Sequence, residues 1–262
     1  MPQKAQAGEL LREWRQRRRL SQLDLAIAAN VSSRHLSFIE TGRARPTSQM
    51  ILRLAEELDV PLRDRNVLLL AGGYAPAYRE RGLADPELTA VRAALQRVLA
   101  GHRPYPAAVV NRWWELVDAN DGIALFTSGV KPELMQPPVN VLRLSLHPSG
   151  LAPRIANLAE WRAHLLMRLR TQIEQTADAV LIDLLAELSK FPATNMLKAR
   201  MPSPRDETAG VFVPLHIVTD AGKLSFLSTT TVFGKPVDVT LSELALECFF
   251  PADDATAQAL QR

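Results

Sequence analysis

The sequence has 262 residues, of which 47% are hydrophobic, so the chain is long enough to bury a substantial core in one or two domains. Its single cysteine excludes an intramolecular disulfide, and it contains no run of about 18 or more apolar residues of the kind that spans a membrane. The N-terminal segment is charged and lacks the apolar core of a signal peptide, so we expect the protein to be cytoplasmic.

The net charge of +3 is distributed unevenly along the chain. Residues 1–45 contain nine Lys/Arg and four Asp/Glu, a net of +5, whereas residues 46–262 contain 22 Lys/Arg and 24 Asp/Glu, a net of −2. A basic segment on a near-neutral body indicates an anionic partner for that segment. On charge alone, a solvated surface explains the same segment equally well.

The first 75 residues have the pattern of short helices joined by brief turns. Hydrophobic periodicity predicts five helices, around residues 10–17, 22–29, 33–41, from about 47, and 62–71. Ser21 precedes the second helix with Asp24 three residues later, which resembles a capping box, and Gly72-Gly73 ends the fifth. We therefore expect an all-α domain over residues 1–75. A linker and connecting helix should follow over residues 76–104, with the helix spanning Pro86 to Leu99.

Residues 105–262 have a different pattern. It predicts two short strands within 107–120, helices over 157–173 and 177–191, and three strands over 210–219, 223–233 and 244–250. Asp220-Ala221-Gly222 is typical of a hairpin turn, and residues 192–209, rich in Pro, Ser and Thr, should form a connection. This order of elements indicates an α+β domain with an antiparallel sheet over residues 105–262.

The third predicted helix lies in the stretch "NVSSRHLSFIETGRARP". On a helical wheel, Leu36 and Ile39 fall on one side with Glu40 beside them, whereas Arg34 lies on the opposite side. Ser32 occupies the expected N-cap position. A helix of this size fits the major groove of B-DNA, about 12 Å wide, and the three-residue turn before it gives the spacing of a helix-turn-helix.

The stretch "LSQLDLAIAANVSSRHLSFIETGRARPTSQMILRLAEELDV" also resembles the Xre/Cro-type helix-turn-helix of phage repressors and bacterial regulators. The resemblance covers nearly all of residues 8–72 and rests on Leu20-Ser21-Gln22, Leu25-Ala26, Val31-Ser32, Leu36, Ile39-Glu40, Gly42 and Pro46.

The resemblance implies a role for each matching position. Residues 33–41 form the recognition helix, and the base contacts come from Ser32, Ser33, Arg34, Ser37 and Phe38. Arg34 is the first choice, because its planar guanidinium can bond guanine O6 and N7 together. Phe38 departs from the polar residue often found there, and either packs on a thymine methyl or covers the helix pair. DNA phosphates are contacted by Gln22, Thr41, Arg43 and Arg45. Arg15 and Glu40 match a partly buried ion pair that joins the first and third helices.

No motif in the remaining residues indicates catalysis. The five histidines are scattered without metal-ligand spacing, and there is no Gly-rich phosphate loop, GxSxG or CxxC motif. Cys248 alternates with apolar residues on a predicted strand, which favours a buried core thiol over a nucleophile or redox sensor. We therefore expect no enzyme activity, no metal and no cofactor, although an active site assembled from distant residues remains an alternative.

Three further stretches, "YPAAVVNRWWELVDAND", "NVLRLSLHPSGLAPRIANLAEWRAHLLMRLRTQI" and "LSFLSTTTVFGKPVDVTLSELALECFFPADD", resemble the C-terminal domain of MmyB-like regulators. The resemblance implies a PAS-like fold, with a five-stranded antiparallel sheet, helices on one side, and a pocket for a small apolar molecule such as a fatty-acyl chain or signalling metabolite. The candidate ligand-binding residues are the polar and aromatic side chains Trp113, Trp114, Asn120, Arg143, His147, Arg154, Asn157 and Trp161. Arg143 could hold a carboxylate, whereas Trp113 and Trp161 also suit a core.

Together these features predict a bacterial transcription regulator that binds a double-stranded DNA operator, with a homodimer on a near-palindromic site and a small apolar ligand in the C-terminal domain. Two alternatives remain: a C-terminal domain that only oligomerises or docks a partner, and an enzyme fused to a DNA-targeting module. No membrane partner is expected.

Overall fold

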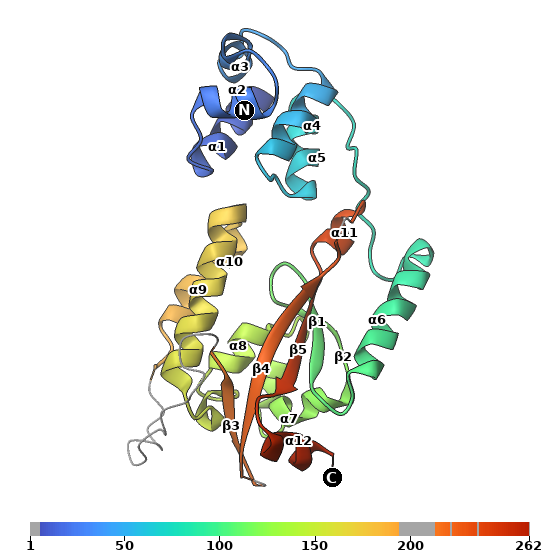
Figure 1. The fold of residues 1–262 in the computed structure, drawn as a ribbon, viewed down its shortest axis with the longest axis vertical. Helices are drawn as coiled ribbons and strands as arrows, with labels where there is room; N and C mark the ends of the chain where they lie inside the picture. Colours follow the sequence, from blue (N-terminus) through green and yellow to red (C-terminus); the bar gives the residue numbers. More distant parts are fainter. Residues whose placement is uncertain (1–5, 194–212, 221, 235, 262) are drawn as a thin grey trace. The chain divides into compact units, whose positions relative to one another are not determined.

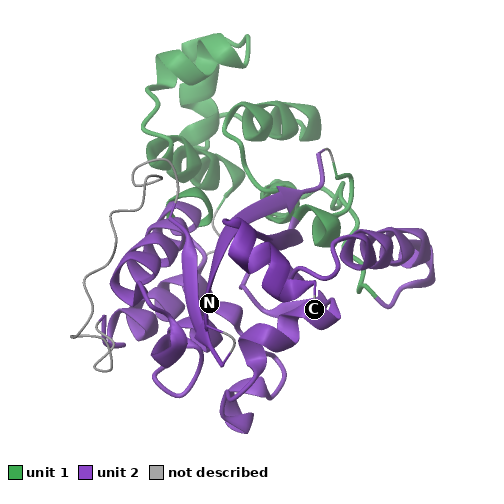
Figure 2. Cartoon of the chain, turned by 60° about the horizontal axis from the view of Figure 1, so that its bottom comes forward, with its two compact units in different colours: residues 1–83, 174–176, 235–242 green, residues 84–173, 177–234, 243–262 purple. Residues whose placement is uncertain are grey.

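The computed structural model describes residues 6–193, 213–220, 222–234 and 236–261 (Figure 1). The chain divides into two compact units, coloured separately in Figure 2. Unit 1 comprises residues 1–83 with the short segments 174–176 and 235–242, and unit 2 comprises the rest. The predicted connection over residues 192–209 falls mostly outside the described residues.

Unit 1 contains the five predicted helices, which confirms an all-α domain. They are α1 (Ala7–Arg17), α2 (Gln22–Ala28), α3 (Ser33–Glu40), α4 (Ser48–Glu57) and α5 (Leu62–Ala71). The first backbone N–H groups of a short helix have no partner within the helix, and polar side chains accept hydrogen bonds from them here. Ser21 forms the predicted capping box with Asp24, while Ser32 and Thr47 cap α3 and α4. The core is apolar, with Leu11, Leu25, Leu36, Ile39, Ile51, Leu54 and Leu68 nearly inaccessible to solvent.

A buried ion pair ties α1 to α3, as the sequence predicted. The Arg15 guanidinium donates from Nε and Nη2 to both carboxylate oxygens of Glu40, at 2.7 and 2.8 Å. The Gln22 side chain donates to the same carboxylate at 2.7 Å, so α2 joins the network. Burial raises the pKa of Glu40, but the hydrogen bonds from Arg15 and Gln22 outweigh it and lower the pKa below its usual range. A charged Glu40 therefore fixes the orientation of α3 on the other two helices.

Unit 2 is built on a five-stranded antiparallel sheet, as predicted. Its strands are β1 (Ala107–Val110), β2 (Leu116–Ala119), β3 (Leu215–Thr219), β4 (Gly222–Val232) and β5 (Ala245–Pro251), in the order β2-β1-β5-β4-β3. The central position of β5 places Glu247 beside Ala108 on one neighbour and Thr230 on the other. Alternation along β5 separates Glu247 and Phe249 from Leu246 and Cys248, which face the opposite side.

Helices cover the face of the sheet that bears Glu247. They include α7 (Ala124–Thr127), α8 (Val141–Leu146), α9 (Leu158–Thr176) and α10 (Ala179–Ser189), whose apolar side chains pack together with strand residues such as Val110 and Phe226. The other helices are α6 (Thr89–Gly101), α11 (Val239–Ser242) and α12 (Asp254–Leu260), with 3-10 turns at Pro86–Leu88, Asp121–Ile123, Pro132–Met135 and Ala152–Arg154. No described helix has the length and apolarity needed to cross a membrane.

Several element boundaries differ from the sequence prediction, and two of the differences have a clear local cause. The helix expected from Pro86 begins at Thr89, because the first three residues form a 3-10 turn capped by the Asp85 side chain. The strand expected over residues 210–219 begins only at Leu215 among the described residues, since Pro214 has no N–H to donate to a ladder. Cys248 is buried, as predicted, and burial raises the pKa of its thiol.

Replacing Glu40 tests how far α3 depends on the ion pair. We expect Glu40→Gln to lower the free energy of unfolding of the helical unit by about 3–5 kcal/mol at pH 7, because it leaves the Arg15 charge buried without its partner. The pKa of Glu40 is lowered in the folded state, so the stabilisation is complete above about pH 4.5 and is lost as pH falls further. The difference between wild type and variant should therefore shrink below that pH.

Urea unfolding of the full-length protein, followed by circular dichroism at several pH values, measures this difference. The matched control is Glu187→Gln, which opens the half-exposed Arg143–Glu187 pair and should cost at most about 1 kcal/mol. Equal losses from both variants at pH 7 would contradict a special role for Glu40.

Candidate functional sites

Helix α3 presents the first candidate surface. Its N-terminal residues Ser32, Ser33 and Arg34 are exposed, whereas Leu36 and Ile39 on the opposite side are buried in the core. The Ser32 hydroxyl accepts a hydrogen bond from the His35 backbone N–H at 3.1 Å and so caps the helix. The exposed end of α3 is therefore held by its own cap and by the packing of its far side.

Phe38 supports two arginines on this surface. Its ring is half-buried, and the guanidinium carbons of Arg34 and Arg43 lie 5.4 and 6.0 Å from the ring centroid. Its backbone carbonyl also accepts hydrogen bonds from the N–H groups of Arg43 and Ala44. Cation–π contacts of this kind restrict the arginines without consuming their hydrogen-bond donors. Phe38 thus acts in this structure as a platform between a helix residue and a loop residue, a role that sequence reasoning did not consider.

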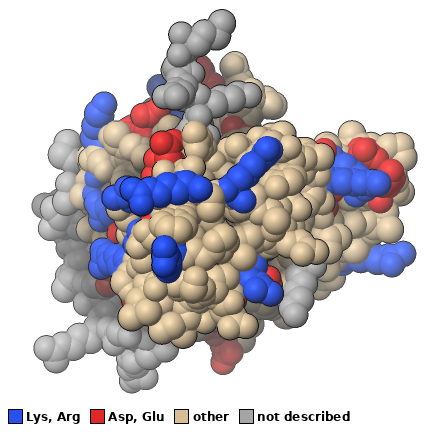
Figure 3. Space-filling model, turned by 90° about the horizontal axis from the view of Figure 1, so that it is seen from above, with Lys and Arg blue, Asp and Glu red and all other residues tan. Residues whose placement is uncertain are grey.

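The remaining candidates for DNA contact differ in how they are already engaged. Ser37 is half-buried, and its backbone carbonyl accepts the Thr41 hydroxyl at 2.7 Å. Gln22 is half-buried and donates to Glu40, while Arg45 donates to the Gly72 carbonyl at 3.0 Å. Arg43 is exposed beside Phe38. Figure 3 shows Lys and Arg side chains spread over the face that it draws, with some Asp and Glu side chains among them.

Two arginines at the C-terminal end of α1, its last residue Arg17 and its C-cap Arg18, make other contacts. The guanidinium groups of Arg17 and Arg18 lie 4.8 and 5.3 Å from the Trp14 ring centroid. Arg18 also donates to the carbonyl oxygens of Leu58 and Asp59, where α4 ends. A cation at the C-terminal end of a helix satisfies its last carbonyls and complements its dipole.

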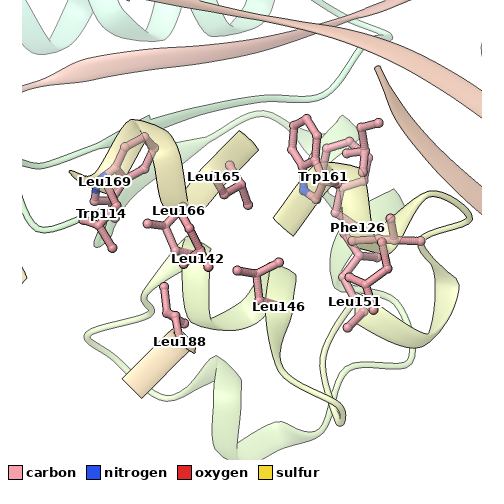
Figure 4. Packing of buried hydrophobic residues seen from close by; sticks show 14 of the residues in the cluster. Trp114, Phe126, Leu142, Leu146, Leu151, Trp161, Leu165, Leu166, Leu169 and Leu188 are labelled. Carbon is pink, nitrogen blue, oxygen red and sulfur yellow. The ribbon is translucent and has the colours of Figure 1, made fainter. Parts of the chain in front are cut away.

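The second candidate site is an apolar pocket inside unit 2, with a cavity volume of about 80 Å³. Its lining comes from β1, β2, β3 and β5 on one side and from the α7, α8 and α9 regions on the other. The apolar lining residues are Ala108, Val110, Trp114, Leu116, Ile123, Phe126, Val139, Val141, Leu142, Leu144, Leu151, Trp161, Leu165, Leu215 and Phe249. Figure 4 shows the packing around Leu142, Trp161 and Leu165.

The pocket also has a small polar component. Ser145 and Thr127 contribute hydroxyl groups, and Arg168 and Glu247 contribute an ion pair. The indole of Trp161 donates to the Ser145 hydroxyl at 3.1 Å, and that of Trp114 donates to Gln172 at 2.7 Å. Both tryptophan N–H groups are thus satisfied, so their rings present apolar surface to the pocket.

Of the eight ligand-binding candidates chosen from the sequence, the structure brings two to this pocket, Trp114 and Trp161. The other six do not line it. Trp113 donates to Asp178, and His147 accepts from the Ser149 N–H. The remaining four bind backbone or another side chain: Asn120 to Leu99 and Tyr105, Arg143 to Glu187, Arg154 to Leu125 and Ser128, and Asn157 to Pro214.

Sequence reasoning missed the charged pair of the pocket. Two signals were present. Glu247 is the one carboxylate in the apolar strand "ALECFF", and Arg168 follows Trp161 and Leu165 at i+7 and i+3, on the same helical face as those core residues. A charged side chain on a buried helix face needs a partner of opposite charge. Glu247, a carboxylate in an apolar strand, is such a partner for Arg168.

The described residues hold no group of three or more His, Cys, Asp or Glu side chains that could bind a metal ion. The groups that line the pocket are apolar walls, two hydroxyls and one ion pair.

Comparison with known families agrees with this division. Residues 6–68 match a helix-turn-helix domain, and residues 91–262 match the MmyB-like transcription regulator ligand binding domain. No curated protein matches the sequence. The two domains indicate a DNA-binding transcription regulator with a ligand-binding domain. Because the second match covers well over half of the chain, the protein belongs to the family of MmyB-like transcription regulators.

Proposed function

We propose that this regulator binds a specific operator through α3 and that a small apolar ligand in the pocket of unit 2 modulates that binding. The observation that carries the proposal is the pocket itself. An apolar cavity within the ligand-binding domain gives a DNA-binding chain a place for a signal molecule.

The DNA-reading side of the proposal rests on the geometry of α3. The N-terminal residues of a recognition helix reach base edges in the major groove, and here these residues are exposed. We propose that Arg34 reads a guanine, with Ser32, Ser33, Ser37 and Phe38 beside the bases. Gln22, Thr41, Arg43 and Arg45 contact phosphates, and Arg43 is the strongest candidate, because its side chain is exposed and packs on the Phe38 ring.

The ligand side rests on the composition of the pocket. Most of its lining is aliphatic or aromatic, with a few polar groups among the apolar walls, which is the composition typical of small-molecule sites. A fatty-acyl-like molecule or an apolar signalling metabolite suits such a lining. Among the residues proposed from the sequence, Trp114 and Trp161 would contact it directly, and the other six would support the walls.

Binding of the ligand must be coupled to DNA binding for regulation. We propose that residues 76–104 transmit the change between an operator-binding domain over residues 1–75 and a ligand-binding domain over residues 105–262. The functional form would be a cytoplasmic homodimer on a near-palindromic site. Coupling requires the ligand to bind two states of the protein with different affinity.

A second candidate function gives unit 2 no ligand, only a role in pairing subunits or docking a partner. Such a body needs a filled core, and the pocket favours sensing instead. An enzyme would need clustered titratable groups in the pocket. The two charged groups found there are bonded to each other, which favours a binding role.

Two substitutions separate base reading from phosphate contact. Arg34→Ala should weaken binding to the cognate operator about 5–150-fold while leaving random DNA nearly unchanged, because it removes a bidentate base contact worth about 1–3 kcal/mol. Arg43→Ala should weaken all sequences alike and reduce the slope of log K against log salt by about 0.9, as expected for one lost phosphate contact.

The operator is first selected from a random DNA library, and binding is then measured by fluorescence anisotropy over a range of salt. Equal effects of Arg34→Ala on operator and random DNA would show that Arg34 does not read bases. Failure of the wild type to select any sequence would overturn the proposed function.

A filled pocket should prevent ligand binding. Ala108 lines the pocket on β1, and Ala108→Leu adds three carbons to that space. We expect it to weaken binding of the neutral fluorophore Nile red at least about tenfold, since the walls are close-packed and cannot retreat freely. The matched control is Ala94→Leu, at an exposed position of α6, which should bind the dye as the wild type does. Equal binding by both variants would place the dye elsewhere.

A further inference from the structure

The two charged side chains that line the pocket neutralise each other. Arg168 of α9 and Glu247 of β5 are the charged residues among the described residues that line it. The guanidinium donates from Nη1 and Nη2 to both oxygens of the carboxylate, at 3.2 and 2.8 Å. Glu247 has a side chain only 8% exposed, and that of Arg168 is 23% exposed. The pair therefore presents no net charge to a molecule in the pocket.

Further contacts hold this pair in place. The Thr230 hydroxyl, on the strand beside β5, donates to Glu247 at 2.8 Å and accepts from Arg168 Nη2 at 2.7 Å. The guanidinium carbon also lies 4.8 Å from the centroid of the Trp114 ring. Arg168 is thus committed to one position by a carboxylate, a hydroxyl and an aromatic face. Because Glu247 already neutralises the guanidinium, an incoming anion would bring a charge into the apolar pocket that no other described lining group compensates.

The cations that could otherwise meet an anion are engaged outside the pocket. Arg143, the residue that sequence reasoning assigned to a carboxylate, donates to both oxygens of Glu187 at 2.6 and 2.7 Å. Arg154 donates to the carbonyl oxygens of Leu125 and Ser128. Neither belongs to the pocket lining. By contrast, the hydroxyls of Thr127 and Ser145 do line it, and they can bond a neutral polar group.

We propose that the ligand is an uncharged molecule, with an apolar chain and a neutral hydrogen-bonding head such as an alcohol, ester or amide, and that the Arg168–Glu247 pair excludes free carboxylates. This inference rests on the proposed function, because it specifies the chemistry of the ligand that the pocket takes. Selection works by a penalty on the wrong head group as well as by a fit to the right one.

A matched twelve-carbon series tests the proposal on the full-length protein. Dodecan-1-ol, methyl dodecanoate and dodecanoate are titrated at pH 8 against bound Nile red, and displacement of the dye is followed by fluorescence. We expect the alcohol and the ester to bind at least about tenfold more tightly than the carboxylate, because only the carboxylate buries a charge that the neutral ion pair does not compensate. Dodecanoate binding as tightly as the alcohol, or more tightly, would overturn the proposal.

Glu247→Gln then tests the pair itself. Removing the carboxylate leaves the Arg168 charge unopposed, so dodecanoate should bind at least about tenfold more tightly than to the wild type, while dodecan-1-ol changes less than about threefold. Glu187→Gln is the matched control, since it releases Arg143 away from the pocket and should leave the ratio unchanged. If Glu247→Gln kept the wild-type preference for dodecan-1-ol over dodecanoate, a feature other than the ion pair would set that preference.

Circular dichroism and thermal unfolding establish whether each variant is folded, and the wild-type series decides the proposal if Glu247→Gln is not. The outcomes also separate this inference from the function on which it rests. If the dye binds and no member of the series displaces it, the chain-bearing ligand class is wrong. If neither the dye nor any member of the series binds, the ligand-binding function itself fails.

Discussion

The packing of one long helix against the sheet decides what unit 2 can do. Helix α9 places Leu158, Trp161, Leu165 and Leu169 against the strand residues, at spacings of three and four along one face. Arg168 sits at the edge of the same face, so covering the sheet also brings a charge to the core. The carboxylate of the central strand β5 compensates it, and the apolar side chains nearby do not fill the whole space between helix and sheet.

Buried ion pairs occur in both units, and each defines a geometry more than it adds stability. The desolvation of two charges offsets much of their attraction, so such pairs act mainly by making alternative arrangements costly. In unit 1, Arg15 and Glu40 hold the recognition helix on its neighbours. In unit 2, Arg168 and Glu247 form a polar region without net charge in the wall of an apolar pocket. The half-exposed Arg143–Glu187 pair carries no such constraint.

The two candidate sites also contrast in how they expose their working groups. On α3, a capped helix with a buried far side presents Arg34 to solvent, and the Phe38 ring limits the freedom of its guanidinium. A side chain restricted in this way loses less conformational entropy when it binds a partner. In unit 2 the working surface faces inward, and its tryptophans have their N–H groups satisfied by Gln172 and Ser145. One site faces solvent with basic side chains, and the other encloses an apolar space.

The sequence by itself determined the elements and the kind of protein. Caps such as Ser21 and Ser32, helical periodicity and strand alternation are local signals, and they predicted the five helices, the antiparallel sheet and the buried face of α3. Tertiary structure alone decided the lining of the pocket. Asn120 and Arg154 had the chemistry of ligand contacts but bind backbone carbonyls 15–29 residues away. Arg168 and Glu247 meet across 79 residues, and no local pattern specifies such a partner because only the folded sheet and helix bring the two together.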